Sequence, residues 1–175
     1  MPRGLYRFHH ARTAHFITFT CYHRFRYLAD PAVRDVFVQA LDRARALYGA
    51  RVYNFVVMPQ HVHLLLSEPE RGTVGNVIQS LKIVSAKRAK KVLGARDLPG
   101  QFWQKRYYDR NEGNHEEFIE KLKYIHRNPV KRKLVERPED WKWSSYRHYS
   151  QGEDCGVEIE SWRNRTQSAD PTIAN

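Results

Sequence analysis

The spacing of hydrophobic and polar residues along the chain predicts its strands. Residues 15–21, HFITFTC, alternate between two faces and are rich in aromatic and β-branched residues, which is typical of a strand. Two further apolar runs, RVYNFVVM (51–58) and HVHLLLS (61–67), predict two more strands joined by a short turn at Pro59 and Gln60.

Two segments show the period of amphipathic helices together with the residues that begin and end a helix. In the segment 30–49, Asp30 suits the N-cap, Pro31 suits the first turn, and Gly49 suits the position after the last turn. The apolar residues between them form one stripe, so this segment predicts a helix. A second helix is expected over about residues 73–93.

A third helix is predicted to begin after Asn114, because Asn114 and Glu117 have the spacing of a capping box. We expect this helix to end near Asn128, since Pro129 disfavours helical geometry in the residue before it. Between the second and third helices, the aromatic and basic segment GQFWQKRYYDR (100–110) predicts a strand or hairpin.

The resulting order, β-α-β-β-α-β-α, resembles a ferredoxin-like split βαβ arrangement with an added C-terminal helix. The predicted fold class is α+β, with an antiparallel sheet whose helices cover one face. We expect a basic arm over residues 1–14, one folded domain over 15–150, and a polar, flexible tail over 151–175.

Composition and charge narrow the class of partner. The chain has 30 Lys and Arg against 19 Asp and Glu, a net charge of +11. This excess favours a polyanionic partner, nucleic acid before an anionic membrane, over a merely basic surface. No stretch approaches the roughly 18 apolar residues of a membrane span, and the N-terminus does not resemble a secretory signal. Cys21 and Cys155 form no metal-binding or disulfide pattern, so we expect a cytoplasmic protein without a membrane partner.

Two histidines interrupt the apolar run NFVVMPQHVHLLLSEP (54–69). Side chains at positions i and i+2 of a strand project from the same face, so His61 and His63 point together. Two neutral imidazoles on one exposed sheet face form half of a divalent-metal site. Two hydrogen-bonded histidines without a metal are the simpler interpretation of the same pattern.

Three metal-dependent chemistries can be compared with this pattern. A histidine-triad nucleotide hydrolase requires a third histidine at the next position on that face, which is Leu65. An amidohydrolase barrel requires a much longer chain. A nuclease in which a metal polarises a phosphodiester agrees with the basic charge, and it requires a third ligand and a nucleophile.

The third predicted helix contains residues suited to both tasks. Phe118, Leu122 and Ile125 form its apolar stripe. At about 100° per residue, a separate face of the helix carries Glu117, Lys121, Tyr124 and Asn128 together. A carboxamide oxygen is a hard ligand that suits Mg²⁺ or Mn²⁺. A hydrogen-bonded tyrosine and a helix-capping asparagine would explain the same spacing without any chemistry.

Three motifs occur in order over roughly residues 15–149: MPQHVHLLL, FWQKRYYDR and YIHRNPVKRKLVERPEDWKWSSYRHY. Together they resemble the REP-associated tyrosine transposases, IS200-like members of the single-tyrosine HUH superfamily, in which HUH denotes His–bulky apolar–His. The resemblance implies that His61 and His63 are the HUH pair and that Tyr124 is the nucleophile. It also implies that Asn128 is the third ligand of Mg²⁺ or Mn²⁺.

The resemblance further implies an endonuclease and strand transferase that cuts and rejoins single-stranded or hairpin repeat DNA through a 5′-phosphotyrosine, acting as a monomer or homodimer. Gln60 departs from the family, which usually has asparagine there. The candidate DNA contacts are cations and aromatic residues, namely Arg12, Lys82, Lys87, Arg88, Phe102, Trp103, Lys105, Arg106 and Tyr107. A catalytically weak binder of structured repeat DNA or RNA is the alternative. A hydrolase of small phosphoesters is disfavoured by the net charge.

Overall fold

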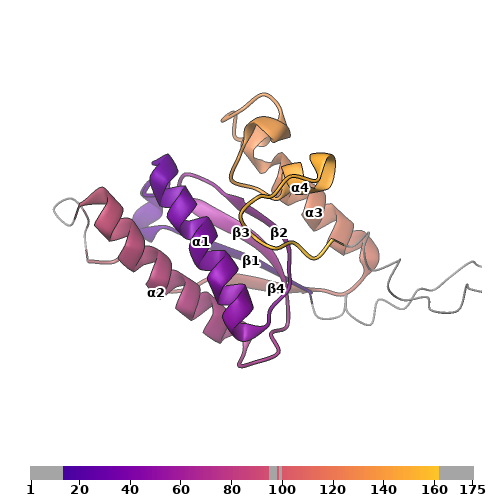
Figure 1. Ribbon diagram of the computed structural model, residues 1–175, viewed down its shortest axis with the longest axis horizontal. Coiled ribbons are helices and arrows are strands. Elements are labelled where there is room, and N and C mark those ends of the chain that lie inside the picture. The colour runs from indigo at the N-terminus through magenta and orange to yellow at the C-terminus, as the bar shows by residue number, and fades with distance from the viewer. Residues whose placement is uncertain (1–13, 95–97, 99, 162–175) are drawn as a thin grey trace, which may run out of the picture.

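The computed structural model describes residues 14–94, 98 and 100–161, and Figure 1 shows their arrangement. The strands in this described part are β1 (Ala14–Thr20), β2 (Val52–Val57), β3 (His61–Ser67) and β4 (Tyr108–Glu112). Its α-helices are α1 (Pro31–Tyr48), α2 (Val74–Leu93), α3 (His115–Lys131) and α4 (Tyr146–Gln151), and its short 3₁₀ turns are η2 (Tyr22–Arg24) and η3 (Pro138–Asp140). The order β-α-β-β-α-β-α and the α+β class are as predicted from the sequence.

The strands form one antiparallel sheet in the order β2-β3-β1-β4. In this register Thr18 on the central strand β1 lies opposite His63 on β3 and opposite Tyr108 on β4. Directly opposed residues project from the same face of a sheet. One row across the sheet therefore carries Tyr108, Thr18 and His63.

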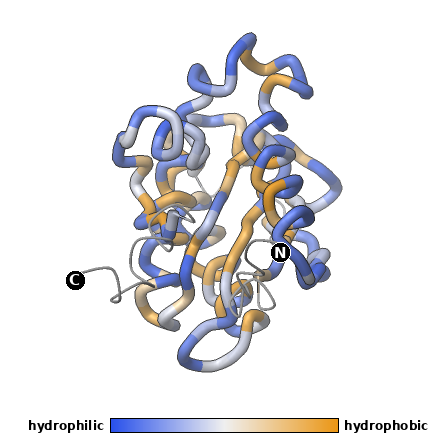
Figure 2. The backbone as a smooth tube through the Cα atoms, turned by 90° about the vertical axis from the view of Figure 1, so that its right-hand side faces the viewer, coloured by the Kyte–Doolittle hydropathy of each residue, from blue (hydrophilic) through white to orange (hydrophobic). Residues whose placement is uncertain are grey.

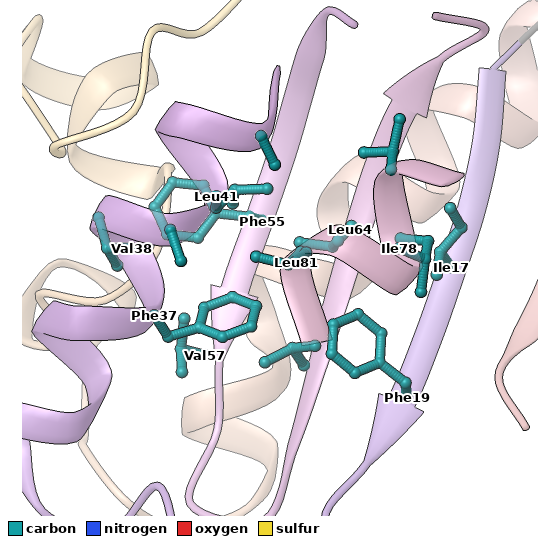
Figure 3. Packing of buried hydrophobic residues seen from close by; sticks show 14 of the residues in the cluster. Ile17, Phe19, Phe37, Val38, Leu41, Phe55, Val57, Leu64, Ile78 and Leu81 are labelled. Atoms are coloured by element: carbon teal, nitrogen blue, oxygen red, sulfur yellow. The ribbon is translucent and has the colours of Figure 1, made fainter. Parts of the chain in front are cut away.

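Helices α1 and α2 pack on one face of the sheet. The core there joins residues of strands β1, β2 and β3 to both helices, and Figure 3 shows Ile17, Phe19, Phe37, Val38, Leu41, Phe55, Val57, Leu64, Ile78 and Leu81. Hydrophobic segments follow the strands through the middle of the molecule, whereas hydrophilic segments follow its outer surface (Figure 2).

Helix α3 covers the opposite face, where Phe118, Leu122 and Ile125 pack on Phe16 and Leu65. The prediction that helices cover only one face is therefore incomplete. Strands β2 and β3 are buried at every position. A near-continuous apolar run is the pattern of a strand that is covered on both faces.

Local sequence signals place the ends of α1 as predicted. Asp30 accepts a hydrogen bond from the backbone N–H of Ala32 at 2.8 Å, and Pro31 occupies the first turn. The helix ends at Gly49, whose φ of 64° lies in the left-handed region that glycine adopts without steric cost.

Helix α3 begins where it was predicted to begin but ends later. The Asn114 side chain accepts a hydrogen bond from the backbone N–H of Glu117 at 2.9 Å. The Glu117 carboxylate accepts from Gly113 at 3.0 Å rather than from Asn114, so the capping box is displaced by one residue. The predicted end at Asn128 is wrong, because the helix continues through Pro129. Both residues are buried, and this packing outweighs the single helical hydrogen bond that a proline removes.

The folded part of the chain extends beyond residue 150, where the tail was predicted to start. Val157 and Ile159 are buried in the core beside α1, and the backbone N–H of Glu160 donates to the carbonyl of Val52 at 2.9 Å. The rest of the predicted tail, the arm before Ala14 and the candidate contact Arg12 lie outside the described residues. Within the described part of the chain, no helix combines the length and the apolar character needed to cross a membrane.

Candidate active site

His61 and His63 lie side by side on the sheet face that α3 covers. Their Nε2 atoms are 3.0 Å apart, and 8% and 5% of their surfaces are exposed. The sequence correctly predicted that both histidines project from one face of the sheet. The intervening Val62 packs on the opposite face with α1 and α2. The sequence did not predict the burial of the histidines, because the covering helix comes from a distant part of the chain.

The surroundings of the two histidines keep both imidazoles neutral. Burial lowers the pKa of His61 to about 4, and the positive charges of Arg132 and Arg24 act in the same direction. Burial likewise lowers the pKa of His63 to about 3, assisted by His61 and Arg132. At neutral pH each ring therefore has a nitrogen lone pair available for a ligand.

Two residues of β1 hold the ring of His63. The hydroxyl oxygen of Thr18 lies 2.7 Å from Nδ1 of His63. The ring of Phe16 stacks on the imidazole with 5.6 Å between centroids and 18° between planes. With Nδ1 engaged by Thr18, the other nitrogen, Nε2, is directed toward His61.

Asn128 reaches this pair from α3. Its Nδ2 atom lies 3.3 Å from Nε2 of His63, and 1% of the residue is exposed. Its Oδ1 atom is buried and has no hydrogen-bond partner among the described residues. A buried carbonyl oxygen without a partner is rare, so this atom is suited to accept a ligand. No group of three His, Cys, Asp or Glu side chains suited to a metal occurs in the described part of the chain, and Asn128 is the amide side chain in contact with the histidine pair.

Tyr124 stands at the edge of the same site and is 38% exposed. Its ring centroid is 5.3 Å from that of His63 and 5.9 Å from that of Phe16. The ammonium groups of Lys121 and Lys131 each lie 5.8 Å from the centre of the tyrosine ring. The structure thus brings the predicted metal ligands, His61, His63 and Asn128, and the predicted nucleophile, Tyr124, into one cluster. The phenol of Tyr124 is open to solvent and has a lysine on each side.

A buried polar network fixes α3 on the sheet. The side-chain amide of Asn54 on β2 donates to the carbonyl of Leu122 at 2.9 Å. The Ser145 hydroxyl contacts Oδ1 of Asn54 and lies 3.1 Å from Nε2 of His126. Since Leu122 and His126 flank Tyr124 on α3, these contacts set the position of the tyrosine relative to the histidine pair.

Several candidate DNA contacts are not available to DNA. Phe102 and Trp103 are only 3% and 5% exposed, and the indole N–H of Trp103 donates to Ser85 at 3.1 Å. Both rings belong to the core, so their predicted stacking role is wrong. Lys82 donates to the carbonyl of Gln104 at 2.8 Å, and burial lowers its pKa.

The remaining candidates do not form a common surface with the histidine pair. Lys87 and Arg88 line a groove of about 540 Å³ between α1 and α2, on the other side of the sheet (Figure 1). Tyr107 is half-buried, with the ammonium of Lys82 5.6 Å from its ring centre. Lys105 and Arg106 are exposed.

Other residues at the site were given no role from sequence. Lys121 and Lys131 flank the tyrosine, and Tyr108 projects from β4 on the same face as His63. Helical spacing placed Lys121 on the face of Tyr124, and the same spacing could have found Lys131, seven residues after Tyr124. Tyr108 required the strand register, which the sequence alone did not supply.

Comparisons with known proteins agree with this fold. A family model described as transposase IS200-like matches residues 9–128. A solved structure of a REP-associated tyrosine transposase bound to a REP hairpin superimposes with a TM-score of 0.65 at 19% identity, covering 85% of this chain and 87% of that one. A candidate transposase from Deinococcus radiodurans R1 gives a TM-score of 0.52 at 21% identity, over 73% and 97% of the two chains. No match to a curated protein was found. The structural similarities show a common fold, and the family match covers more than half of the sequence, so the chain belongs to the IS200-like transposase family.

Proposed function

We propose that this protein is a metal-dependent endonuclease and strand transferase that cuts and rejoins single-stranded or hairpin DNA through Tyr124. The observation that carries the proposal is the convergence of Tyr124 and Asn128 from α3 with His63 and His61 from β3. A nucleic-acid binder without chemistry has no need for a neutral imidazole pair beside an exposed phenol.

The donor set suits a divalent cation. His61 and His63 would contribute neutral Nε2 atoms, and the buried Oδ1 of Asn128 would gain the partner that it lacks. Imidazole nitrogens with an amide oxygen are compatible with Mn²⁺ or Mg²⁺. A cation bound there would withdraw charge from a non-bridging oxygen of the scissile phosphate.

The covalent step is assigned to Tyr124. Its phenolic oxygen forms a bond to phosphorus, the bond from phosphorus to the 3′ oxygen breaks, the phenolic proton is released, and the departing 3′ oxygen takes up a proton. The products are a 5′-phosphotyrosine and a free 3′-hydroxyl. Attack by another 3′-hydroxyl reverses the step, so rejoining needs no nucleotide cofactor. Lys121 and Lys131 stand where they can offset the negative charge of the phosphate and phenolate.

Hairpin repeat DNA is the substrate class that we assign. The similar solved structure is bound to a REP hairpin. The net charge of +11 and the cations around Tyr124 favour a polyanion. A catalytically weak binder of structured repeat DNA or RNA is the alternative function.

The test is incubation of the full chain with a labelled hairpin-DNA library and Mn²⁺, followed by denaturing electrophoresis and mass spectrometry. We expect a DNA adduct on Tyr124 that is lost in Tyr124→Phe and on addition of a chelator. His63→Ala should abolish cleavage while DNA binding and its salt dependence persist. His148→Ala, a matched control outside the cluster, should cleave normally. Binding without cleavage or adduct in any divalent metal would reject the transferase and leave the binder.

A further inference from the structure

An exposed aromatic side chain, Tyr108, stands beside the candidate active site. Tyr108 on β4 is 53% exposed, although it lies in the same row of the sheet as Thr18 and the buried His63. In the described part of the chain its hydroxyl makes no hydrogen bond. An exposed aromatic on a sheet face that also carries chemistry is suited to contact a ligand.

Tyr108 and Tyr124 both contact the buried ring of Phe16. The ring centroid of Phe16 is 6.3 Å from Tyr108 and 5.9 Å from Tyr124, and both contacts are edge-on. The ammonium of Lys121 lies 4.9 Å from the centre of the Phe16 ring. Two exposed phenols and a cation therefore surround a common apolar centre.

The spacing between Tyr108 and the histidine pair corresponds to the step from a phosphate to a neighbouring base. Tyr108 is two strands away from His63, which is about 10 Å across a sheet. A phosphate bound beside Tyr124 would have Lys121 near it, and a nucleoside next to that phosphate would be within reach of Tyr108.

We propose that Tyr108 is the stacking platform for an unpaired nucleobase next to the scissile phosphate, an inference that rests on the proposed function. The flat ring accepts the face of any base, so this contact fixes the position of the strand without reading its sequence. The binding site then has two parts: the histidines, Asn128 and Tyr124 act on the phosphate, and Tyr108 holds the adjacent nucleotide in place.

The experiment begins with DNA hairpins that have unpaired extensions, selected by binding to the Tyr124→Phe protein, which cannot form the adduct. 2-Aminopurine is placed in turn at the unpaired positions on both sides of the cleavage site. We expect quenching of its fluorescence at one position on binding, loss of that quenching in Tyr108→Ala, and its retention in Tyr108→Phe. Tyr48→Leu, at a half-buried position at the end of α1, is the matched control and should retain it.

A second measurement separates stacking from a structural effect. In proteins that keep Tyr124, Tyr108→Ala should weaken the apparent affinity for the hairpin by at least about fivefold. An abasic site at the quenched position should weaken wild-type binding by a similar factor and should add little to the effect of Tyr108→Ala.

The outcomes distinguish the two proposals. Normal cleavage and an undiminished quench in Tyr108→Ala would overturn the stacking role and leave the proposed nuclease intact. Failure of Tyr108→Phe to retain the quench would assign the effect to the hydroxyl and also overturn stacking. If no hairpin is selected and no adduct forms, the proposed function fails and this inference fails with it.

Discussion

The hydroxyl oxygen of Thr18 lies 2.7 Å from Nδ1 of His63, across two paired strands of the sheet. This contact engages one nitrogen of the ring and leaves Nε2 directed at His61 and Asn128. Outer contacts of this kind orient histidine ligands and tune metal affinity. Strand β1 therefore contributes to the site through Thr18. It contains neither the predicted metal ligands nor the predicted nucleophile.

Replacing Thr18 tests this contact. Thr18→Val keeps the shape of the side chain and removes the hydroxyl, so we expect Mn²⁺ affinity to fall by roughly 10–100-fold. Titration calorimetry of the DNA-free protein measures this directly. Thr20→Val is the matched control, because the Thr20 hydroxyl has no hydrogen bond to any described residue. Equal affinities of wild type and Thr18→Val would show that the Thr18 hydroxyl does not orient the ligand.

Asn54 should contribute to both stability and activity. Asn54→Leu removes the side-chain donor to the buried carbonyl of Leu122 and one of the contacts of the Ser145 hydroxyl, so we expect a loss of about 1–3 kcal/mol in the free energy of unfolding. Urea denaturation should show this loss. Adduct formation should fall even where the variant is fully folded, because Tyr124 is positioned through α3. The exposed Asn111→Leu should change stability by no more than about 0.5 kcal/mol. An Asn54 variant with normal stability would contradict the role of the network.

His126 should make the free energy of unfolding depend on pH. Burial lowers its pKa from 6.5 to about 4, so between these values the unfolded chain binds the proton and the folded chain does not. The free energy of unfolding should therefore decrease as pH falls through this window, by at most about 3 kcal/mol from this residue. Urea denaturation at pH 7 and pH 4.5 measures how much the free energy of unfolding changes with pH in the wild type and in His126→Gln. His126→Gln should show the weaker dependence, and a stronger one would refute the assignment.

Arg34 on α1 should stabilise the packing of Trp143 and the chain around it against this helix. Its guanidinium donates to the carbonyls of Leu28 and Ala29 at 2.7 and 2.8 Å and lies 3.8 Å from the ring centre of Trp143. Lysine cannot reproduce this planar contact, so Arg34→Lys should lower the free energy of unfolding by about 2 kcal/mol. Arg43→Lys, at an exposed position on the same helix, is the control for thermal or urea denaturation. Equal losses in the two variants would show that the buried contacts of Arg34 are not the cause of the lost stability.

Local features of the sequence determined the secondary structure and the pairing of the histidines. Asp30 and Gly49 define the ends of α1 through caps that involve only neighbouring residues. The two-residue period of a strand was sufficient to place His61 and His63 on one face. The same reasoning placed Tyr124 off the apolar stripe of its helix. These conclusions were possible because each depends on backbone geometry within a few residues.

Only the tertiary structure decided what covers each residue. The helical period could not show that α3 lies over the histidines, or that Trp103 is buried while Tyr108 on the same segment is exposed. It could not show that Lys87 lies on the other side of the sheet from His63. Burial, pKa and access to a ligand depend on contacts between segments that are distant in sequence, and such contacts follow from strand order and helix packing rather than from local propensity.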